Sequence, residues 1–155
     1  MTDTTAKSGG GIPPGHGCEP VSEMRRRIEG GASLVVARGG EIVAVERGRG
    51  ITPLLKALDA GLLEGSSAMD RVIGRAAAAI CAAGRVAEVF TPLAAEGAAE
   101  VLARRGATLE AERVVATILN RDGTDSCPME KAVRGLDDPE EMVEAVRRTL
   151  ERMQG

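Results

Sequence analysis

The sequence predicts an α/β fold from three observations. Stretches with helical and strand-like periodicity alternate along the chain, which is typical of a mixed sheet with helices on its faces. Two strand-like stretches, 33–38 and 41–47, flank Gly39-Gly40 and predict a hairpin with a two-residue turn. The nearly continuous apolar run 69–83 predicts a buried helix that packs against the sheet.

Capping and turn residues divide the rest of the chain. A polar residue precedes proline at Thr52-Pro53 and Asp138-Pro139, which predicts helix starts with Thr52 as an N-cap, and Pro128 predicts another start. Gly84 and Gly106 are expected to end helices. The predicted helices are 22–31, 54–63, 69–83, 92–105, one from Pro128, and 139–153, and the predicted strands are 33–38, 41–47, 86–90 and 109–119.

Length and composition predict one domain preceded by a tail. A chain of 155 residues that is 43% hydrophobic and 28% charged can bury one core. Residues 1–20 are rich in Gly, Pro, Ser and Thr and are expected to form a disordered tail, which leaves 21–155 as the domain. The chain shows no signal-peptide pattern and no apolar run of membrane-spanning length, so we expect a cytoplasmic protein without membrane association.

The residue types that are scarce restrict the chemistry. There is no Trp or Tyr, one Phe and one His, and the histidine, His16, lies in the tail. With a net charge of −3, this composition argues against a nucleic-acid binder, which would combine a basic surface with aromatic side chains. Three cysteines at irregular spacing indicate no disulfide framework.

Cys127 is the candidate catalytic residue. It precedes Pro128 at a predicted helix start, where free amides and the helix dipole favour a thiolate. A nucleophilic role also needs assistance from another group, for which Glu130 or Asp122 is available outside the tail. The alternative is that Cys127 is only a small residue at a helix start, while Cys81 in the apolar helix is a core residue.

Two polar loops lead into predicted helices and could bind an anion. Residues 120–124 read Asn-Arg-Asp-Gly-Thr, in which Arg121 supplies charge and Asp122 could accept a hydrogen bond from a ribose hydroxyl. The alternative for this loop is a turn that only reverses the chain. Gly48-Arg49-Gly50 leads into the helix after Pro53 in a similar way, although it matches neither the P-loop nor the dinucleotide fingerprint.

Asp70, Arg71 and Arg75 interrupt the apolar run 69–83. In the first turn of a helix, Asp70 would satisfy free amides and the helix dipole. Arg71 and Arg75 are four residues apart, so on a helix they would share a face and point either to the phosphates of a ligand or to solvent.

Several segments together resemble a small prokaryotic family that is known only as a domain of unknown function. The segments are SLVVARGGEIV, GRGITPLL, MDRVIGRAAA, LDDPEE and, above all, NRDGTDSCPMEKAV, and the resemblance spans about residues 22–147. The resemblance implies a cytidine-deaminase-like fold, which is a three-layer α/β/α sandwich around a mixed five-stranded sheet.

The resemblance does not imply zinc-dependent deamination. A zinc deaminase needs a His or Cys two residues before a Glu at one helix start, and a PCxxC-type pair at the next. On such a fold these places should fall near 67–70 and 91–96, which read SAMD and TPLAAE and contain no ligand set. We therefore expect neither a metal site nor deaminase activity.

Other members of this fold class bind nucleotides without zinc, so by analogy we expect a nucleotide-like or phosphorylated small ligand, with an ADP-ribose-like compound as one candidate. A thiol enzyme that uses Cys127 and a structural or interaction module without a ligand are the alternatives, and a homo-oligomer is left open. The expected ligand site is a cleft at the strand ends formed by Gly48, Arg49, Gly50, Asp70, Arg71, Asn120, Arg121, Asp122, Thr124 and Glu130, with Cys127 beside it.

Overall fold

The computed structural model describes residues 18–120 and 122–154 and confirms the α/β class. The helices are α1 (Cys18–Glu29), α2 (Thr52–Asp59), α3 (Arg75–Ala83), α4 (Ala98–Ala103), α5 (Pro128–Ala132) and α6 (Pro139–Gln154). The strands are β1 (Leu34–Arg38), β2 (Glu41–Glu46), β3 (Ser67–Asp70), β4 (Val72–Ile73), β5 (Glu88–Ala95) and β6 (Thr108–Val115). Helix α1 begins inside the stretch 1–20 that was assigned to the tail, whereas His16 and Arg121 lie outside the described residues.

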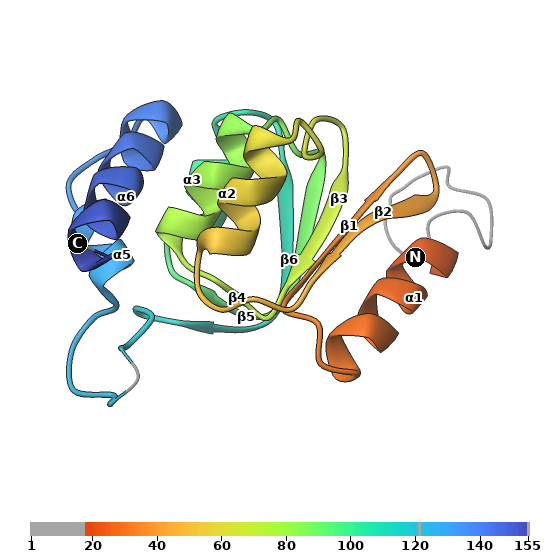
Figure 1. Ribbon diagram of the computed structural model, residues 1–155, viewed down its shortest axis with the longest axis horizontal. Helices are drawn as coiled ribbons and strands as arrows, with labels where there is room; N and C mark the ends of the chain where they lie inside the picture. Colours follow the sequence, from red (N-terminus) through yellow and green to blue (C-terminus); the bar gives the residue numbers. More distant parts are fainter. Residues whose placement is uncertain (1–17, 121, 155) are drawn as a thin grey trace.

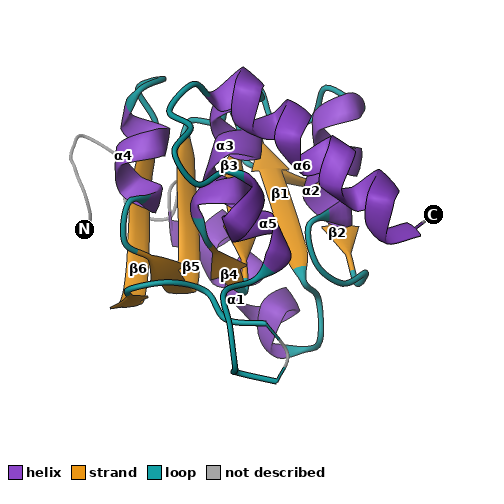
Figure 2. Cartoon of the chain, turned by 90° about the vertical axis from the view of Figure 1, so that its left-hand side faces the viewer, coloured by secondary structure: helices purple, strands orange, loops and turns teal. Residues whose placement is uncertain are grey.

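The six described strands form one mixed sheet in which only β1 runs against the others. β1 pairs antiparallel with both β2 and β3, whereas β3, β4 and β6 all pair parallel with β5. β2 and β6 lie at the two edges of the sheet, as Figure 2 shows. The five parallel strands therefore all end on the same side of the sheet, which we call the carboxyl edge.

The prediction of five strands was wrong, because two short strands fill one position in the sheet. β3 and β4 follow each other along the same side of β5 and keep the same register against it. This register places the break between them, at Arg71, opposite Pro92 in β5. Proline has no N–H to donate to a neighbouring strand, so the ladder is interrupted at this point.

The hairpin and the last helix form as predicted. β1 and β2 are joined by Gly39 and Gly40, whose φ angles of 63° and 83° suit a two-residue hairpin turn. α6 starts at Pro139, and Asp138 caps it by accepting a hydrogen bond from the amide of Glu141 at 3.0 Å. Both features depend on residues that are neighbours in the sequence.

Two predicted helices begin later than the sequence suggested. The first part of the run 69–83 lies in β3 and β4, and α3 covers only the second part. The start of the predicted helix 92–105 likewise belongs to β5, and α4 has only six residues. For the run 69–83 the prediction failed because a short apolar stretch fits a strand of a covered sheet as well as a buried helix.

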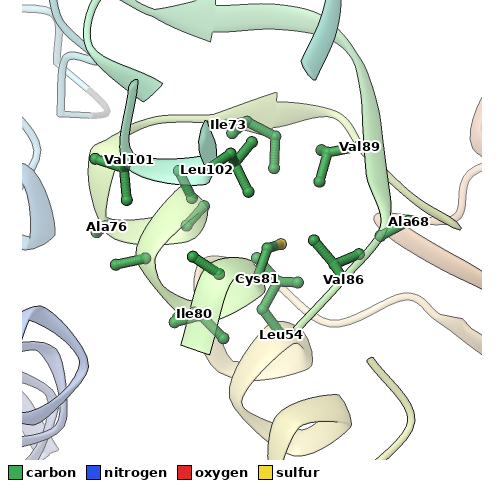
Figure 3. Packing of buried hydrophobic residues seen from close by; sticks show 14 of the residues in the cluster. Leu54, Ala68, Ile73, Ala76, Ile80, Cys81, Val86, Val89, Val101 and Leu102 are labelled. Carbon is green, nitrogen blue, oxygen red and sulfur yellow. The ribbon is translucent and has the colours of Figure 1, made fainter. Parts of the chain in front are cut away.

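The sheet separates two hydrophobic clusters. The larger cluster lies between the sheet and helices α2 to α6, and in it Ile80 and Cys81 of α3 are fully buried (Figure 3). This confirms Cys81 as a core residue, and burial raises the pKa of its thiol far above the ordinary value. In the smaller cluster, Met24 and Ile28 of α1 pack with Met69 on the other face. Figure 1 shows α1 on one side of the sheet and the remaining helices on the other.

Candidate functional site

Three helix starts meet at the carboxyl edge of the sheet. Because their preceding strands are parallel, α2, α3 and α4 all begin there, and Figure 1 shows this for α2 and α3. β6 also ends at this edge, and the segment 116–127 connects it to α5. Amides at helix starts attract anions, so the carboxyl edge is where the expected ligand site would lie.

A carboxylate of the chain itself occupies the start of α3. Glu130 in α5 accepts a hydrogen bond from the amide of Arg75 through Oε1 and from the amide of Ala76 through Oε2, both at 2.9 Å. The fit is close, because a Cβ added to Gly74 would lie 2.5 Å from Oε2 of Glu130. Glu130 was expected to contact a ligand or to assist Cys127. Both of its carboxylate oxygens are instead hydrogen-bonded to the backbone of α3.

Arg71 and Arg75 do not share a face, contrary to the prediction. Arg71 lies at the break between β3 and β4, and its guanidinium donates to two carbonyls at the end of α1, including that of Ile28 at 2.7 Å. Arg75 is the first residue of α3 and donates to two carbonyls that follow α5 on the opposite side of the sheet, including that of Leu136 at 2.7 Å. The prediction failed because it placed both residues on one helix.

The described residues of the loop 120–124 form a turn that is closed by hydrogen bonds to Asn120. The carbonyl of Asn120 accepts a hydrogen bond from the amide of Gly123 at 3.0 Å, and its side-chain Oδ1 accepts one from the amide of Thr124 at 3.1 Å. Gly123 has a φ of 72°, which suits a chain reversal. Asp122 is exposed on this turn. The described part of the loop therefore matches the alternative in which it reverses the chain.

Cys127 stands directly before α5, as predicted. Its amide donates to the carbonyl of Ile118 at 2.8 Å, and its carbonyl accepts from the amide of Lys131 at 3.0 Å. The side chain is half-buried against the larger hydrophobic cluster. Since Glu130 is engaged at α3, Asp122 is left as the acid–base partner that was proposed for a reactive thiol.

Asp70 is a partly buried carboxyl at the end of β3. It pairs with Leu34 across the sheet, so the two side chains point to the same face, toward the larger cluster. Its Oδ1 accepts a hydrogen bond from the amide of Val72 at 3.3 Å. Removal from solvent raises the pKa of Asp70 to about 7, and the amides of Val72 and Arg71 and the charge of Arg71 oppose this shift only in part.

The start of α2 carries no side-chain cap from any described residue. Ile51 takes the N-cap position with helical dihedral angles, so the prediction of Thr52 as N-cap was wrong and Thr52 lies inside the first turn. Gly48, Arg49 and Gly50 precede it and are all exposed. Within the described residues, Arg49 forms no ion pair with a carboxylate.

The sheet register places Asp70 near the chain that leads into α2. Glu46 at the end of β2 and Asp70 in β3 are both direct partners of Leu34 in β1. Neighbouring strands are about 4.8 Å apart, so the backbones of Glu46 and Asp70 lie about 10 Å apart. Gly48 follows Glu46 by two residues. The structure thus brings Asp70 and the segment 48–50 to one section of the carboxyl edge.

The two places at which a zinc ligand set was sought are strands. Residues 67–70 form β3, and most of 91–96 lies in β5. The helices that follow these strands start at Gly74-Arg75 and Gly97-Ala98, whose side chains cannot ligate zinc. In the residues that the structure describes, no three His, Cys, Asp or Glu side chains are grouped so that they could hold a metal ion.

Comparison with known proteins gives the family. Residues 24–150 match the family model described as TM1506: Domain of unknown function (DUF1893). The chain belongs to the DUF1893 family. A crystal structure of a DUF1893 family protein (TM1506) from Thermotoga maritima is similar, with a TM-score of 0.76 and 21% sequence identity over 98% of this chain and 99% of that chain. No curated protein matches this chain.

The structure of this DUF1893 chain joins two segments that carried the resemblance. Glu130 belongs to NRDGTDSCPMEKAV, whereas Gly74 and Arg75 belong to MDRVIGRAAA, and they meet at the start of α3. Nothing in the single sequence indicated this contact, because 55 residues separate Arg75 from Glu130. No helix in the described part of this DUF1893 chain is both long and apolar enough to cross a bilayer.

Proposed function

We propose that this DUF1893 protein binds a small phosphorylated or nucleotide-like ligand at the start of α2, on a three-layer, cytidine-deaminase-like scaffold without a zinc site. The observation that supports this proposal is a difference between two helix starts in how their amides are capped. Glu130 caps α3, whereas no described side chain caps α2. An anion bound to the first amides of α2 would take the place that the Glu130 carboxylate takes at α3.

The residues around the start of α2 suit a phosphate group. Pro53 has no N–H, so the amides of Thr52 and Leu54 on either side of it are the available donors. Arg49 is exposed and can add two parallel hydrogen bonds to phosphate oxygens. Gly50 has a φ of 66°, which favours glycine and turns the chain directly before the helix.

Asp70 supports a ligand that carries hydroxyl groups as well as a phosphate. With a pKa of about 7, its carboxyl is protonated in about half of the molecules at neutral pH and can donate or accept a hydrogen bond. The ionised form repels a nearby anion, whereas the protonated form does not. The affinity for ADP-ribose, whose pyrophosphate has no terminal phosphate that takes up a proton in this range, is therefore expected to rise as the pH falls from about 8 to about 6.

The experiment is a thermal denaturation series with inorganic phosphate, ADP and ADP-ribose, followed by calorimetric titration of any compound that raises Tm. A ligand that binds only the native state must raise Tm increasingly with its concentration. Arg49→Ala is expected to remove the shift while changing the Tm of the free protein by less than about 2 °C. Arg113→Ala, which removes an exposed arginine from β6, is the matched control and should keep the shift.

Two outcomes would contradict the proposal. One is that none of the three probes raises Tm at about 5 mM, a concentration that would reveal even millimolar affinity. The other is that Arg49→Ala and Arg113→Ala lower the shift equally, because that would place the ligand away from α2. The first outcome would favour the interaction-module alternative, which agrees with the engagement of Glu130, Arg71 and Arg75 inside the chain.

A further inference from the structure

One face of the sheet is only partly covered by a helix. Among the described helices only α1 lies on this face, and it packs on β1, β2 and β3. On β5 and β6 the same face carries a set of side chains that we call the open strip. A groove of about 210 Å³ lies between the open strip and Arg25 of α1. The open strip consists of Phe90, Pro92, Glu110, Glu112 and Val114.

We propose that the open strip binds helix α1 of a second copy of this chain in a two-fold symmetric dimer. Helix α1 forms a ridge on this face of the sheet (Figure 1). The groove lies directly beside it, because Arg25 of α1 is one of the residues that line the groove. A two-fold axis that runs between them would place each α1 on the open strip of the partner, which makes the contact self-complementary. Each α1 would then pack between two sheets.

The dimensions of the open strip fit one helix. Two neighbouring strands span about 10 Å across a sheet, and an α-helix with its side chains is about 10 Å wide. Arg25 of α1 already pairs with Glu112 at 2.5 Å, so the height of a helix on this face brings guanidinium groups within reach of β6. A second α1 beside the first would lie at the same height.

Charges on α1 and on the open strip are complementary. Glu23 accepts hydrogen bonds from both Arg26 and Arg27, so a single negative charge is shared between two positively charged side chains. The side chain of Arg26 is 66% exposed on the outer surface of α1. In the open strip, Glu110 forms no ion pair with any side chain of residues 18–120 or 122–154. In the dimer, Arg26 of each copy would lie against Glu110 of the other.

A dimer formed through the free edge of β6 is less favourable than the face-to-face arrangement. Glu110 and Glu112 alternate with Ala111 and lie on the same face of β6. In an antiparallel pair of β6 strands centred on Ala111, each glutamate would lie opposite a glutamate of the partner, and directly opposed like charges destabilise a sheet. In this register the charges therefore favour the partner's α1 over a second β6.

The size of the contact predicts a weak dimer. Eight residues of strand extend over about 26 Å, so a strip about 10 Å wide covers about 260 Å². Together with the outer surface of α1 this gives about 400 to 500 Å² per copy, below the roughly 800 Å² per partner that is usual for stable complexes. We therefore expect a dissociation constant in the micromolar to submillimolar range that rises with ionic strength.

The test uses a pair of charge-reversal variants of the full chain, Arg26→Glu and Glu110→Arg. Analytical ultracentrifugation at about 0.5 mM protein and about 50 mM salt should show a dimer for the unaltered chain and monomers for each variant alone. An equimolar mixture of the two variants should recover the dimer, because the introduced glutamate of one variant then meets the introduced arginine of the other while the second contact is unchanged. Arg148→Glu and Glu141→Arg on α6 carry the same changes in net charge and should dimerise like the unaltered chain.

Three results would overturn the proposal. The first is that the unaltered chain sediments as a monomer under these conditions, and binding of an arginine-rich peptide by that monomer would assign the open strip to a different partner. The second is that each variant dimerises as strongly as its matched control on α6. The third is that the mixture fails to recover the dimer although circular dichroism shows both variants folded. None of these results bears on phosphate binding at α2, which lies on the opposite side of the sheet.

Discussion

The starts of α2 and α3 lie at the same edge of the sheet but differ in how their amides are used. Each helix follows a strand of the parallel set and has a glycine and an arginine beside its first turn. At α3, Glu130 accepts the amide hydrogen bonds, and Arg75 is bound to carbonyls after α5. At α2, no described side chain takes either role. A residue far along the chain therefore decides whether the amides at a helix start are occupied.

The largest effect is expected from removing the cap on α3. Glu130→Ala leaves two amides in a partly buried site without their charged acceptor, which should lower the free energy of unfolding by about 3 kcal/mol. Urea denaturation measures this, with the exposed Glu144→Ala on α6 as the control, expected within about 0.5 kcal/mol of the unaltered chain. Added sulfate should stabilise Glu130→Ala more than the control, because α3 then resembles α2. Equal stability of the two variants would show that the cap contributes nothing.

The next effect concerns the pH dependence that Asp70 introduces. Its pKa is raised in the folded state, so folding favours the protonated form, and the resulting stability is present below about pH 4 and is lost as the pH rises through about 7. We expect the unaltered chain to lose about 2 kcal/mol from this group between about pH 5 and about pH 8. Asp70→Asn should flatten this loss in urea denaturation, whereas Asp122→Asn on the exposed turn should not. A profile unchanged by Asp70→Asn would mean that its carboxyl titrates normally.

An effect of similar size distinguishes the glycines before the two helices. An added Cβ at Gly74 would lie 2.5 Å from Glu130, whereas at Gly48 its nearest contact is Pro53 at an ordinary 3.4 Å. Gly74→Ala should therefore displace the cap and cost about 2 kcal/mol. Gly48→Ala should be neutral or slightly stabilising, because it reduces the freedom of the unfolded chain. Thermal denaturation measures the stability of the two variants. An equal loss of stability in both would show that the starts of α2 and α3 do not differ in how tightly they are packed.

The smallest effect is expected from Arg49→Ala. Since Arg49 forms no ion pair with the described carboxylates, its removal should change the free energy of unfolding by less than about 0.5 kcal/mol. Arg75→Ala should cost about 2 kcal/mol, because the carbonyls of Val133 and Leu136 lose a charged donor. Urea denaturation of both variants measures these two changes in the free energy of unfolding. A large loss for Arg49→Ala would indicate that α2 is stabilised by contacts within the chain, as α3 is.

Sequence patterns predicted the parts of the fold that depend on neighbouring residues. The Gly39-Gly40 hairpin and the Asp138 cap of α6 require only local backbone conformations. The break at Arg71 could not be predicted, because it depends on Pro92 in the neighbouring strand. For the same reason the two arginines were placed on one helix, although the strand break and the start of α3 direct them to opposite faces.

The candidate site was predicted only in part. Gly48, Arg49 and Asp70 were chosen from local features, and the parallel strands bring them to the same edge. Glu130 was chosen as a ligand contact, yet its carboxylate binds α3, a contact between residues that are distant in sequence. Such contacts depend on how α5 packs, which a single sequence does not reveal. The interactions proposed for Arg121 fall outside the described residues.

The Glu130 cap also has a consequence for how the protein is made. When the ribosome has produced α3, the carboxylate that completes its first turn has not yet been synthesised, because 55 residues separate Arg75 from Glu130. Closing a loop of that length has an entropic cost that must be met before the contact stabilises the helix. The nascent chain should therefore stay loosely packed, and open to chaperones and proteases, until α5 has left the exit tunnel.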